Sequence, residues 1–398
     1  MKVRKTLKYR LYRNRRNKVL MNRIDVAGII WNHTIALQRR YYRLTGGYVG
    51  QSRMQRHLLK LRRSQRFAFW QKVGSQAVQQ IAERHHKAYQ RFFDDKAGRS
   101  QLKVGRPTFK KVKKYKSFTL KQAGWKLLGD NKIQIQGYTY KFSLSRPITG
   151  DIKTVTIKRD NLGQLWVCFS VIQDVPNPVV ISTGNMGGFG RSVAPRHFGL
   201  KIFLTDSEGS TYQHPQYLKT ELKTIALLNR SLSRKVKGSG NWHKSKRRLA
   251  KAHLRIAHKR TDAHWKLAHE LASKFDTLFF EDLNIKGMQK LWGRKVSDLG
   301  FATFLPIQEQ VCQKTGKQFH KIGRWQRTTG QCSCCRHQQT VGLSQRIFEC
   351  ESCGLVMDRD WNAAINICVE GASSTGLGDV RQKLISAVTA QPQESQQL

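Results

Sequence analysis

The sequence has few acidic residues and no long apolar segment. Its 398 residues include 25 Asp and Glu against 73 Lys and Arg, which gives a formal net charge of +48. No uncharged apolar run reaches the roughly 18 residues that a membrane-spanning helix needs, and the basic N-terminus lacks the apolar stretch of a signal peptide. We therefore expect no membrane partner and a cytoplasmic location, associated with the nucleoid if the host is a prokaryote.

A charge balance this uneven disfavours some functions. A compact chain with this charge repels itself unless a polyanion neutralises it, so a metabolic enzyme for small neutral substrates is disfavoured. The hydrophobic fraction of 39% is sufficient for folded cores, and the length is typical of two to four domains. The first 120 residues contain 32 Lys and Arg but four acidic residues, which predicts nucleic acid as the partner.

The basic N-terminal region also shows helical periodicity. Leu20, Ile24, Ala27 and Trp31 fall on one face of a predicted helix. Residues 117–172 instead contain short β-rich runs separated by turn residues, which predicts a small barrel or sandwich. Between these regions, a basic segment interleaves lysines with aromatic residues, a pattern typical of nucleic-acid binding, although each lysine is also compatible with a plain solvated charge. The candidate phosphate contacts in this segment are Lys110, Lys111, Lys113 and Lys114.

Five of the eight cysteines lie between residues 332 and 353. Two Cys-x2-Cys pairs separated by residues 336–349 are typical of a thiolate cage around a structural Zn²⁺. The neighbouring Cys334 and, more weakly, His337 are alternative ligands, and buried reduced cysteines without a metal are the alternative to a cage. The predicted ligands are Cys332, Cys335, Cys350 and Cys353.

Two carboxylates at the ends of predicted elements form the second candidate site. Glu281 directly follows the apolar run TLFF, and Asp360 lies where the segment DRDWNAAINI begins a helix. An acidic residue in a first helical turn often only complements the helix dipole. A carboxylate at a strand end together with one at a helix start is, however, how Mg²⁺-dependent nucleases of the RNase H type build a metal site. Such a site would need a third carboxylate on the first strand.

The order of these motifs resembles the TnpB family, which are RNA-guided nucleases of insertion sequences related to type V CRISPR effectors. The resemblance rests on GLKIFLT, FFEDLNIKGM, the four-cysteine segment and DRDWNAAINI, together with N-terminal segments in the same order. It implies an α+β fold in which a helical recognition domain is inserted into a small wedge-type β-barrel, followed by an RNase H-like RuvC domain that contains a zinc ribbon.

The resemblance also implies domain boundaries. The expected ranges are 1–12 and 105–173 for the barrel, 13–104 for the helical domain, 174–196 for a linker, 197–325 and 356–370 for the RuvC domain, 326–355 for the ribbon and 371–398 for a flexible tail.

The sequence departs from the family at the first catalytic acid. When the chain is aligned on the GLK segment at 199–201, the family's first Asp corresponds to His197, whereas Glu281 and Asp360 match the other two acids. An imidazole offers one neutral nitrogen and cannot bridge two metals, while Mg²⁺ prefers oxygen ligands. None of residues 175–205 is acidic, so we expect the remnant site to be inactive.

This departure leads us to expect a nuclease-dead, RNA-guided DNA-binding protein, similar to TnpB-like nuclease-dead repressors. By this resemblance the partners are a guide RNA and a double-stranded DNA target next to a short flanking motif, and bound protein represses transcription. The alternatives are an active endonuclease, a decayed transposon remnant, and an RNA-binding protein that only sequesters its transcript. Zn²⁺ is the expected structural cofactor, and Mg²⁺ is expected only if the nuclease site is active.

Overall fold

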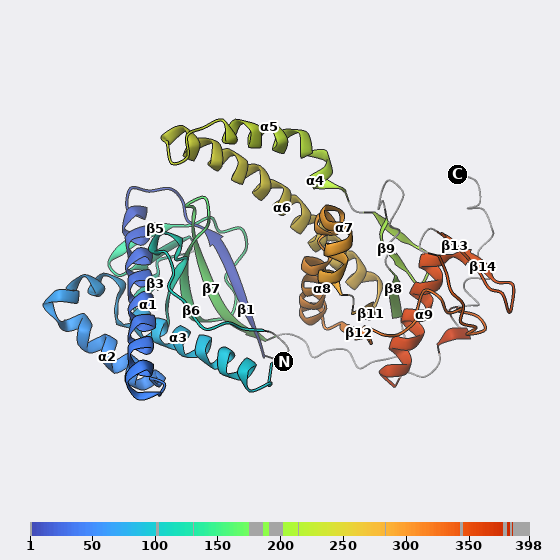
Figure 1. Cartoon of the computed structure of the whole chain (residues 1–398), viewed down its shortest axis with the longest axis horizontal. Coiled ribbons are helices and arrows are strands. Elements are labelled where there is room, and N and C mark those ends of the chain that lie inside the picture. Colours follow the sequence, from blue (N-terminus) through green and yellow to red (C-terminus); the bar gives the residue numbers. More distant parts are fainter. Residues whose placement is uncertain are drawn as a thin grey trace. The chain divides into compact units, whose positions relative to one another are not determined.

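The chain forms two compact units, residues 1–174 and 175–398 (Figure 1). The structure is a computed structural model, and it describes residues 2–100, 103–129, 131–174, 186–190, 202–213, 215–282, 284–342, 345–376, 380–382 and 384. Over these residues, none of the helices combines the length and the apolar character that crossing a membrane would require. Helices and sheets occur in both units, so the α+β class expected from the sequence is confirmed.

The first unit is built on a four-stranded antiparallel sheet in the order β1-β7-β6-β2. Along β7, Leu165, Val167, Phe169 and Val171 are buried at every second position, as the two-residue period of a strand requires. A three-stranded meander in the order β3-β4-β5 completes the β structure described in this unit. The strands are β1 (Lys2–Arg10), β2 (Ser117–Leu120), β3 (Trp125–Leu127), β4 (Lys132–Ile135), β5 (Tyr138–Lys141), β6 (Asp151–Arg159) and β7 (Leu165–Asp174).

The described strands form no closed barrel, and the small wedge-type β-barrel implied by the resemblance stays a prediction. Pairing in the larger sheet starts at β1 and ends at β2, and these two edge strands are not paired with each other. The meander forms a separate sheet, which an isolated bridge between Leu11 and Phe142 joins to the segment that follows β1. A barrel requires a continuous ring of paired strands, so the first unit contains two open sheets.

Helices occupy most of the range expected for the helical domain. Leu20, Ile24, Ala27 and Trp31 are all buried, which confirms the apolar face predicted from their spacing. On the same helix, a Cβ atom at Gly28 would lie 2.8 Å from Cβ of Tyr115, so glycine permits close approach of the segment before β2. The helices are α1 (Asn17–Thr45), α2 (Gln51–Arg63), α3 (Ser75–Lys96) and two 3₁₀ helices, η1 (Gln65–Val73) and η2 (Val112–Lys114).

His85 of α3 lies inside the helical core and is 1% exposed. Its ring lies 4.7 Å from Tyr89 and 6.2 Å from Trp31, centroid to centroid. Neither ring nitrogen has a hydrogen-bond partner among the described residues. Burial lowers the pKa of His85 to about 4, and the nearby His86 lowers it further by a smaller amount. The folded unit therefore holds this imidazole neutral.

We expect the first unit to lose stability as the pH falls from 6.5 to 4. The unfolded chain titrates near the ordinary histidine value, about 6.5, so it binds more protons than the folded chain in this window, and His85 alone costs about 3 kcal/mol. Replacing His85 with Leu should remove that part of the pH dependence, which denaturant unfolding at several pH values measures. An equally steep loss of stability in His85→Leu would contradict this assignment.

The second unit contains a five-stranded sheet in the order β10-β9-β8-β11-β12. Strand β11 runs parallel to both β8 and β12, whereas β9 runs antiparallel to β8 and β10. Helix α9 packs on β8, and α6 packs on α8. The strands are β8 (Met186–Gly190), β9 (Ile202–Asp206), β10 (Thr211–Gln213), β11 (Thr277–Glu281) and β12 (Gln318–Ile322).

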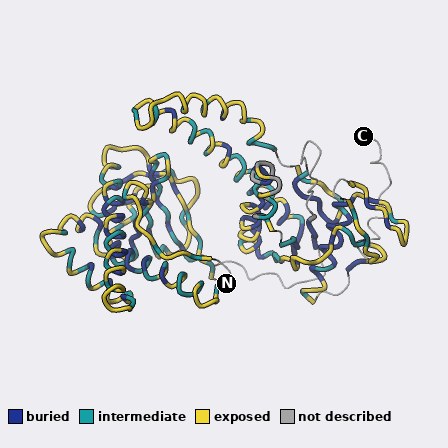
Figure 2. The backbone as a smooth tube through the Cα atoms, viewed as in Figure 1, coloured by how far each residue is buried: buried dark blue, intermediate teal, exposed yellow. Residues whose placement is uncertain are grey.

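The remaining elements described in this unit are six helices and a short hairpin. They are α4 (Tyr217–Thr220), α5 (Leu222–Ser233), α6 (Gly240–Lys274), α7 (Ile285–Leu299), α8 (Phe301–Thr315), α9 (Arg359–Ser374), β13 (Ile347–Glu349) and β14 (Val356–Asp358). Helix α5 and the first half of α6 are mostly exposed, as the yellow tube in Figure 2 shows. The buried residues described in this unit lie mainly in the sheet, in the second half of α6, and in α8 and α9.

The structure differs from the linker expected at 174–196, because β8 lies inside that range. A Cβ atom at Gly188 would lie 2.2 Å from the carbonyl oxygen of Ala364 and 2.4 Å from the amide nitrogen of Cys368. Only glycine lets α9 pack this closely on the strand. The short run MGGFG has no alternation of apolar and polar residues, so the sequence pattern indicated a loop.

Candidate functional site

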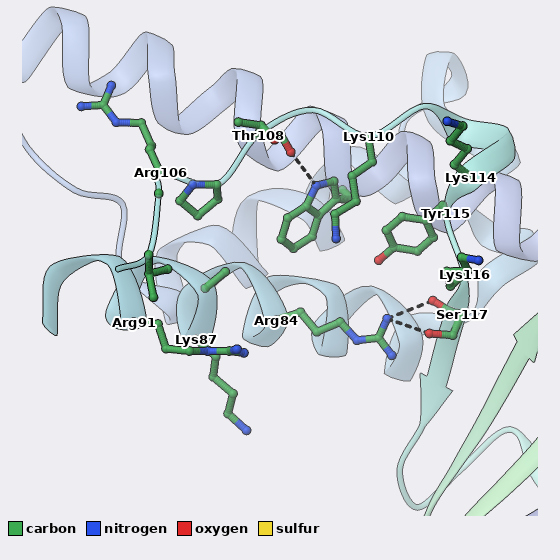
Figure 3. Close-up of a pocket in the computed structure, with 15 residues that line it drawn as sticks. Arg84, Lys87, Arg91, Arg106, Thr108, Lys110, Lys114, Tyr115, Lys116 and Ser117 are labelled. Atoms are coloured by element: carbon green, nitrogen blue, oxygen red, sulfur yellow. Dashed lines mark hydrogen bonds between the residues drawn. The ribbon is translucent and has the colours of Figure 1, made fainter. Parts of the chain in front are cut away.

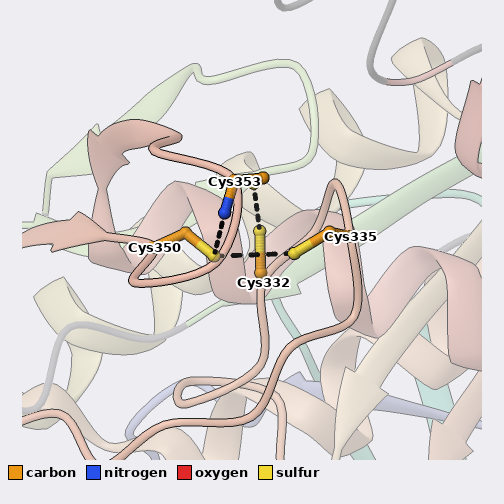
Figure 4. Close-up of side chains that lie close together, drawn as sticks. All are labelled: Cys332, Cys335, Cys350 and Cys353. Carbon is orange, nitrogen blue, oxygen red and sulfur yellow. Dashed lines mark hydrogen bonds between the residues drawn. The ribbon is translucent and has the colours of Figure 1, made fainter.

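The four predicted zinc ligands lie together at one end of the second unit (Figure 4). Their sulfur atoms are all within 4.8 Å of one another, with 3.7 Å between Cys332 and Cys353 and 3.5 Å between Cys335 and Cys350. A tetrahedral site with Zn–S distances of about 2.3 Å has sulfur atoms about 3.8 Å apart. The cluster therefore fits a four-thiolate metal site in both ligand type and size.

The two Cys-x2-Cys segments have the same backbone geometry. The amide of Cys332 donates to the carbonyl of His337, and the amide of Cys350 donates to Leu355 in the same way. Each second cysteine is followed by a residue with positive φ, 66° at Arg336 and 69° at Gly354. Both turns thus present their two sulfur atoms to the same point, which is how a metal-binding knuckle works.

The alternative ligands left open by the sequence lie outside the cluster. Cys334 is exposed and is not among the four clustered residues, and His337 instead lies 3.9 Å from the Glu351 carboxylate. A backbone hydrogen bond from His337 lowers the pKa of the Cys335 thiol to about 6, whereas burial raises the pKa of the Cys332 thiol. A cation would favour the thiolate form of every ligand.

Two buried asparagines of α9 attach the first knuckle to the helix. The Asn362 side chain accepts from the amide of Ser333 and donates to the carbonyl of Gln331. One turn later, Asn366 donates to the carbonyls of Thr328 and Gln331. The i, i+4 spacing of these asparagines in DRDWNAAINI is a signal that could have predicted this contact. Through it, the cysteine cluster supports the helix that carries Asp360.

The first remnant acid, Glu281, is the last residue of strand β11, which lies between β8 and β12. Thr328 donates a hydrogen bond of 2.6 Å to its Oε1 atom. The next residue, Asp282, forms an ion pair with Arg324 at 2.8 Å. The predicted position at a strand end is confirmed, and the threonine contact occupies one of the oxygen atoms that a metal would use.

The second remnant acid, Asp360, lies in the first turn of α9. Asp358 is the N-cap, and its side chain accepts from the amides of Asp360 and Trp361. Burial raises the pKa of Asp358, and the charge of Asp360 raises it further. The buried guanidinium of Arg359 lies 3.4 Å from Oδ1 of Asp360. Asp360 is thus already next to a cation within the protein.

The strand beside Glu281 supplies no third carboxylate. Residues 186–190 of β8 are Met, Gly, Gly, Phe and Gly, and β8 is the parallel neighbour of β11 on one side. His197, the residue aligned with the family's first acid, lies outside the described residues. Of the segment GLKIFLT, the described residues 202–205 belong to β9, and β8 precedes them in the chain and lies between β9 and β11 in the sheet.

Asp206 is a structural residue and does not replace the missing acid. Its carboxylate is fully buried and accepts from the Tyr212 hydroxyl at 2.9 Å and from Lys274 Nζ at 3.0 Å. It also accepts from the amides of Glu208 and Ser210, which closes the turn after β9. With these four donors around it, the carboxylate has no free side for a metal ion.

The four candidate phosphate contacts have different surroundings. Lys113 forms an ion pair with Asp25 at 2.5 Å, and Lys110 lies with Nζ 4.4 Å from the ring centroid of Trp31. Lys114 lines the same pocket as Lys110, whereas Lys111 is exposed and does not line it. The structure therefore separates a pair of lysines that face a pocket from a pair that do not.

A second basic surface, which the sequence analysis did not single out, is the helical hairpin of α5 and α6. Residues 219–251 contain eleven Lys and Arg and one acidic residue. Leu227 and Val236 are exposed on this hairpin, at 61% and 80%. Its run of positive charge was a signal in the sequence that could have identified it.

Comparison with known proteins agrees with this geometry. Residues 197–291 match the family model OrfB_IS605, described as "Probable transposase", and residues 301–367 match the "Cas12f1-like, TNB domain" family. The chain resembles TnpB. The second match includes both cysteine pairs and Asp360.

Relatives are found along most of the chain. A "Putative RNA-guided DNA endonuclease" of Streptomyces pristinaespiralis is 26% identical over 386 residues, which cover 95% of this chain and 92% of the relative. "TnpB-like protein L79" of Acanthamoeba polyphaga mimivirus is 32% identical over 247 residues, 58% of this chain and 46% of that protein.

A solved structure shares the fold. A chain from the cryo-EM structure of a Cas12f1-sgRNA-target DNA complex superimposes with a TM-score of 0.51 at 14% identity, and the match covers 92% of this chain and 99% of that chain. The resemblance to TnpB stated from the motifs is thereby supported, and the nuclease-dead subtype stays a prediction.

Proposed function

We propose that this protein binds a guide RNA, recognises duplex DNA through it next to a short flanking motif, and represses transcription without cutting the DNA. The relatives named as RNA-guided DNA endonucleases support the RNA and DNA partners. The observation that carries the loss of cutting is the absence of any acidic residue from 175 to 205, which includes β8 and His197.

Two remaining acids are insufficient for the two-metal reaction. Phosphoryl transfer by this chemistry needs several carboxylate oxygens to hold hard cations on both sides of the reacting phosphate. Here one oxygen of Glu281 accepts from Thr328, and Asp360 lies beside Arg359. We infer that these acids now support the fold, and that Mg²⁺ has no catalytic role.

We further propose that the four-cysteine cluster holds a structural Zn²⁺. Four cysteine ligands leave no open position for a substrate or water, so the metal would stabilise the ribbon and take no part in chemistry. Cys332 and Cys350 are buried and Cys335 and Cys353 are exposed, which is compatible with metal entry from solvent.

An active endonuclease is the second candidate, because the printed names of the relatives describe that activity. It requires an acid from outside residues 175–205 to complete the site. A buried and fully hydrogen-bonded Asp206 does not provide one, so the geometry favours the binding function.

We expect one discrete RNA to co-purify with the protein expressed from its native locus. Sequencing should find a constant scaffold joined to a short guide segment, and a DNA duplex that contains the guide sequence should bind the loaded protein. As a control, a duplex with a scrambled guide sequence should not bind. A random RNA population with no RNA-directed DNA binding would overturn the proposed function and leave a nonspecific nucleic-acid binder or a remnant.

A further inference from the structure

A pocket of about 670 Å³ lies in the first unit between α1, α3 and residues 104–117 (Figure 3). Among the described residues that line it, seven are basic and none is acidic. The basic residues are Arg84, Lys87, Arg91, Arg106, Lys110, Lys114 and Lys116.

Two of the pocket cations, Arg84 and Lys110, lie at positions fixed by neutral groups. Arg84 donates to the carbonyl oxygen of Ser117 at 2.9 Å and to the hydroxyl of Thr119 at 2.7 Å. The backbone of Lys110 is fixed by Asn32, which accepts from its amide and donates to its carbonyl, both at 2.8 Å. Neither set of contacts neutralises the positive charge of Arg84 or Lys110.

Two carboxylates near the pocket are paired with cations. Glu83, next to Arg84 in α3, contacts the pocket residue Lys87 and also Lys121, both at 2.8 Å. Asp25 of α1 contacts Arg159 at 2.7 Å in addition to Lys113, and neither of these cations lines the pocket. Lys87 is therefore compensated, whereas the other six basic lining residues form no ion pair with an acid in the part of the chain that the structure describes.

The positive charge of Lys110 is also partly removed from water. Burial lowers the pKa of Lys110, and the charge of Arg84 lowers it further. Like charges at partly buried positions repel each other more strongly than in water. A bound anion would relieve this repulsion and make charge-assisted hydrogen bonds to both side chains.

We propose that this pocket binds a phosphate group of a nucleic-acid strand and is the principal phosphate-recognition site of the first unit. The inference deepens the proposed function and rests on it for the identity of the anion as nucleic acid. At the rim, the Arg106 guanidinium lies over the rings of Tyr42 and Phe92, at 5.6 and 5.9 Å. A nucleic-acid strand that extends out of the pocket would therefore meet a cation and an aromatic surface.

The test compares two double variants of one short segment with equal loss of charge. Lys110→Gln with Lys114→Gln removes the pocket-facing pair, and Lys111→Gln with Lys113→Gln removes the pair that faces elsewhere. The probe is the co-purified RNA, labelled and added back to RNA-free full-length protein. Substituting the pocket-facing pair should weaken RNA binding at least about 10-fold and lower the salt dependence of RNA affinity by an amount equal to one to two phosphate contacts. Substituting the other pair should weaken RNA binding by less than about 3-fold. Equal losses would overturn the proposal.

A second measurement uses the unaltered protein. Inorganic pyrophosphate should protect Lys110 from amine-modifying reagents more than it protects Lys111, as read by mass spectrometry. If the two lysines react equally with and without pyrophosphate, the proposal that this pocket binds phosphate would also be overturned.

Repeating the variants at the DNA-capture step identifies the strand. A loss at RNA loading assigns the phosphate to RNA, and a loss only at DNA capture assigns it to DNA; no loss at either step contradicts the proposal. Failure of the proposed function has a different signature. In that case no discrete RNA is found, yet substituting the pocket-facing pair still weakens binding of any RNA more than substituting the control pair does.

Discussion

Replacing Cys350 with Ser is expected to abolish zinc binding at the proposed four-cysteine site and to unfold the segment from about residue 326 to the first turns of α9. The binding free energy of a structural zinc site, about 10–16 kcal/mol, is available only to the folded segment. Outside its cysteines, this segment buries a small apolar cluster around Phe348. Because Asn362 and Asn366 connect the first knuckle to α9, loss of the metal should also loosen the region around Asp360.

The matched control is Cys334→Ser, which changes an exposed cysteine outside the cluster. Zinc per chain, measured by mass spectrometry of the metal, should stay near one in Cys334→Ser and fall to near zero in Cys350→Ser. Limited proteolysis should cut the ribbon in Cys350→Ser but not in Cys334→Ser. A Cys350→Ser protein that retains full zinc would refute the four-thiolate cage, and zinc loss in Cys334→Ser would mean that the ligand set is different.

The parts of the site that depend on local spacing were predictable from the sequence. The two Cys-x2-Cys pairs predicted their own cluster, because four thiolates at this spacing have few other uses. Glu281 and Asp360 were placed at a strand end and a helix start by the apolar run before one and the helical pattern after the other. The buried face of α1 followed from its helical period.

Features that depend on tertiary contacts were not predictable. The run that forms β8 has three glycines in five residues, which lowers strand propensity, and it becomes a central strand because α9 packs directly on Gly188. Strand pairing in the first unit was unpredictable for a similar reason, since local β patterns do not specify which strands pair or whether they form a closed ring. The surroundings of Lys110 and Lys113 differ because of Trp31 and Asp25, which are distant in the sequence.

The largest functional expectation is that the RNA-loaded protein binds its DNA target but leaves it uncut in Mg²⁺. Aligning the sequence places His197 at the first acid, and the sheet places β8 beside Glu281; neither contains a carboxylate. An Asp at Gly188 would not fit either, because even its Cβ atom would lie 2.2 Å from the backbone of α9. Both arguments therefore predict the same inactive site.

The control for this expectation is the double variant Glu281→Gln with Asp360→Asn, which removes both remnant acids. Wild type and double variant should show the same absence of cleavage on a plasmid that contains the guide sequence, within about twofold of background. Cleavage by the wild type that the double variant loses would show an active nuclease and overturn the proposed loss. Changing His197 to Asp then tests the alignment. Mg²⁺-dependent cutting could appear in His197→Asp and disappear again when Glu281→Gln is added. That result would mean that the histidine at position 197 alone had inactivated the site, because metal binding would then require carboxylates at both positions.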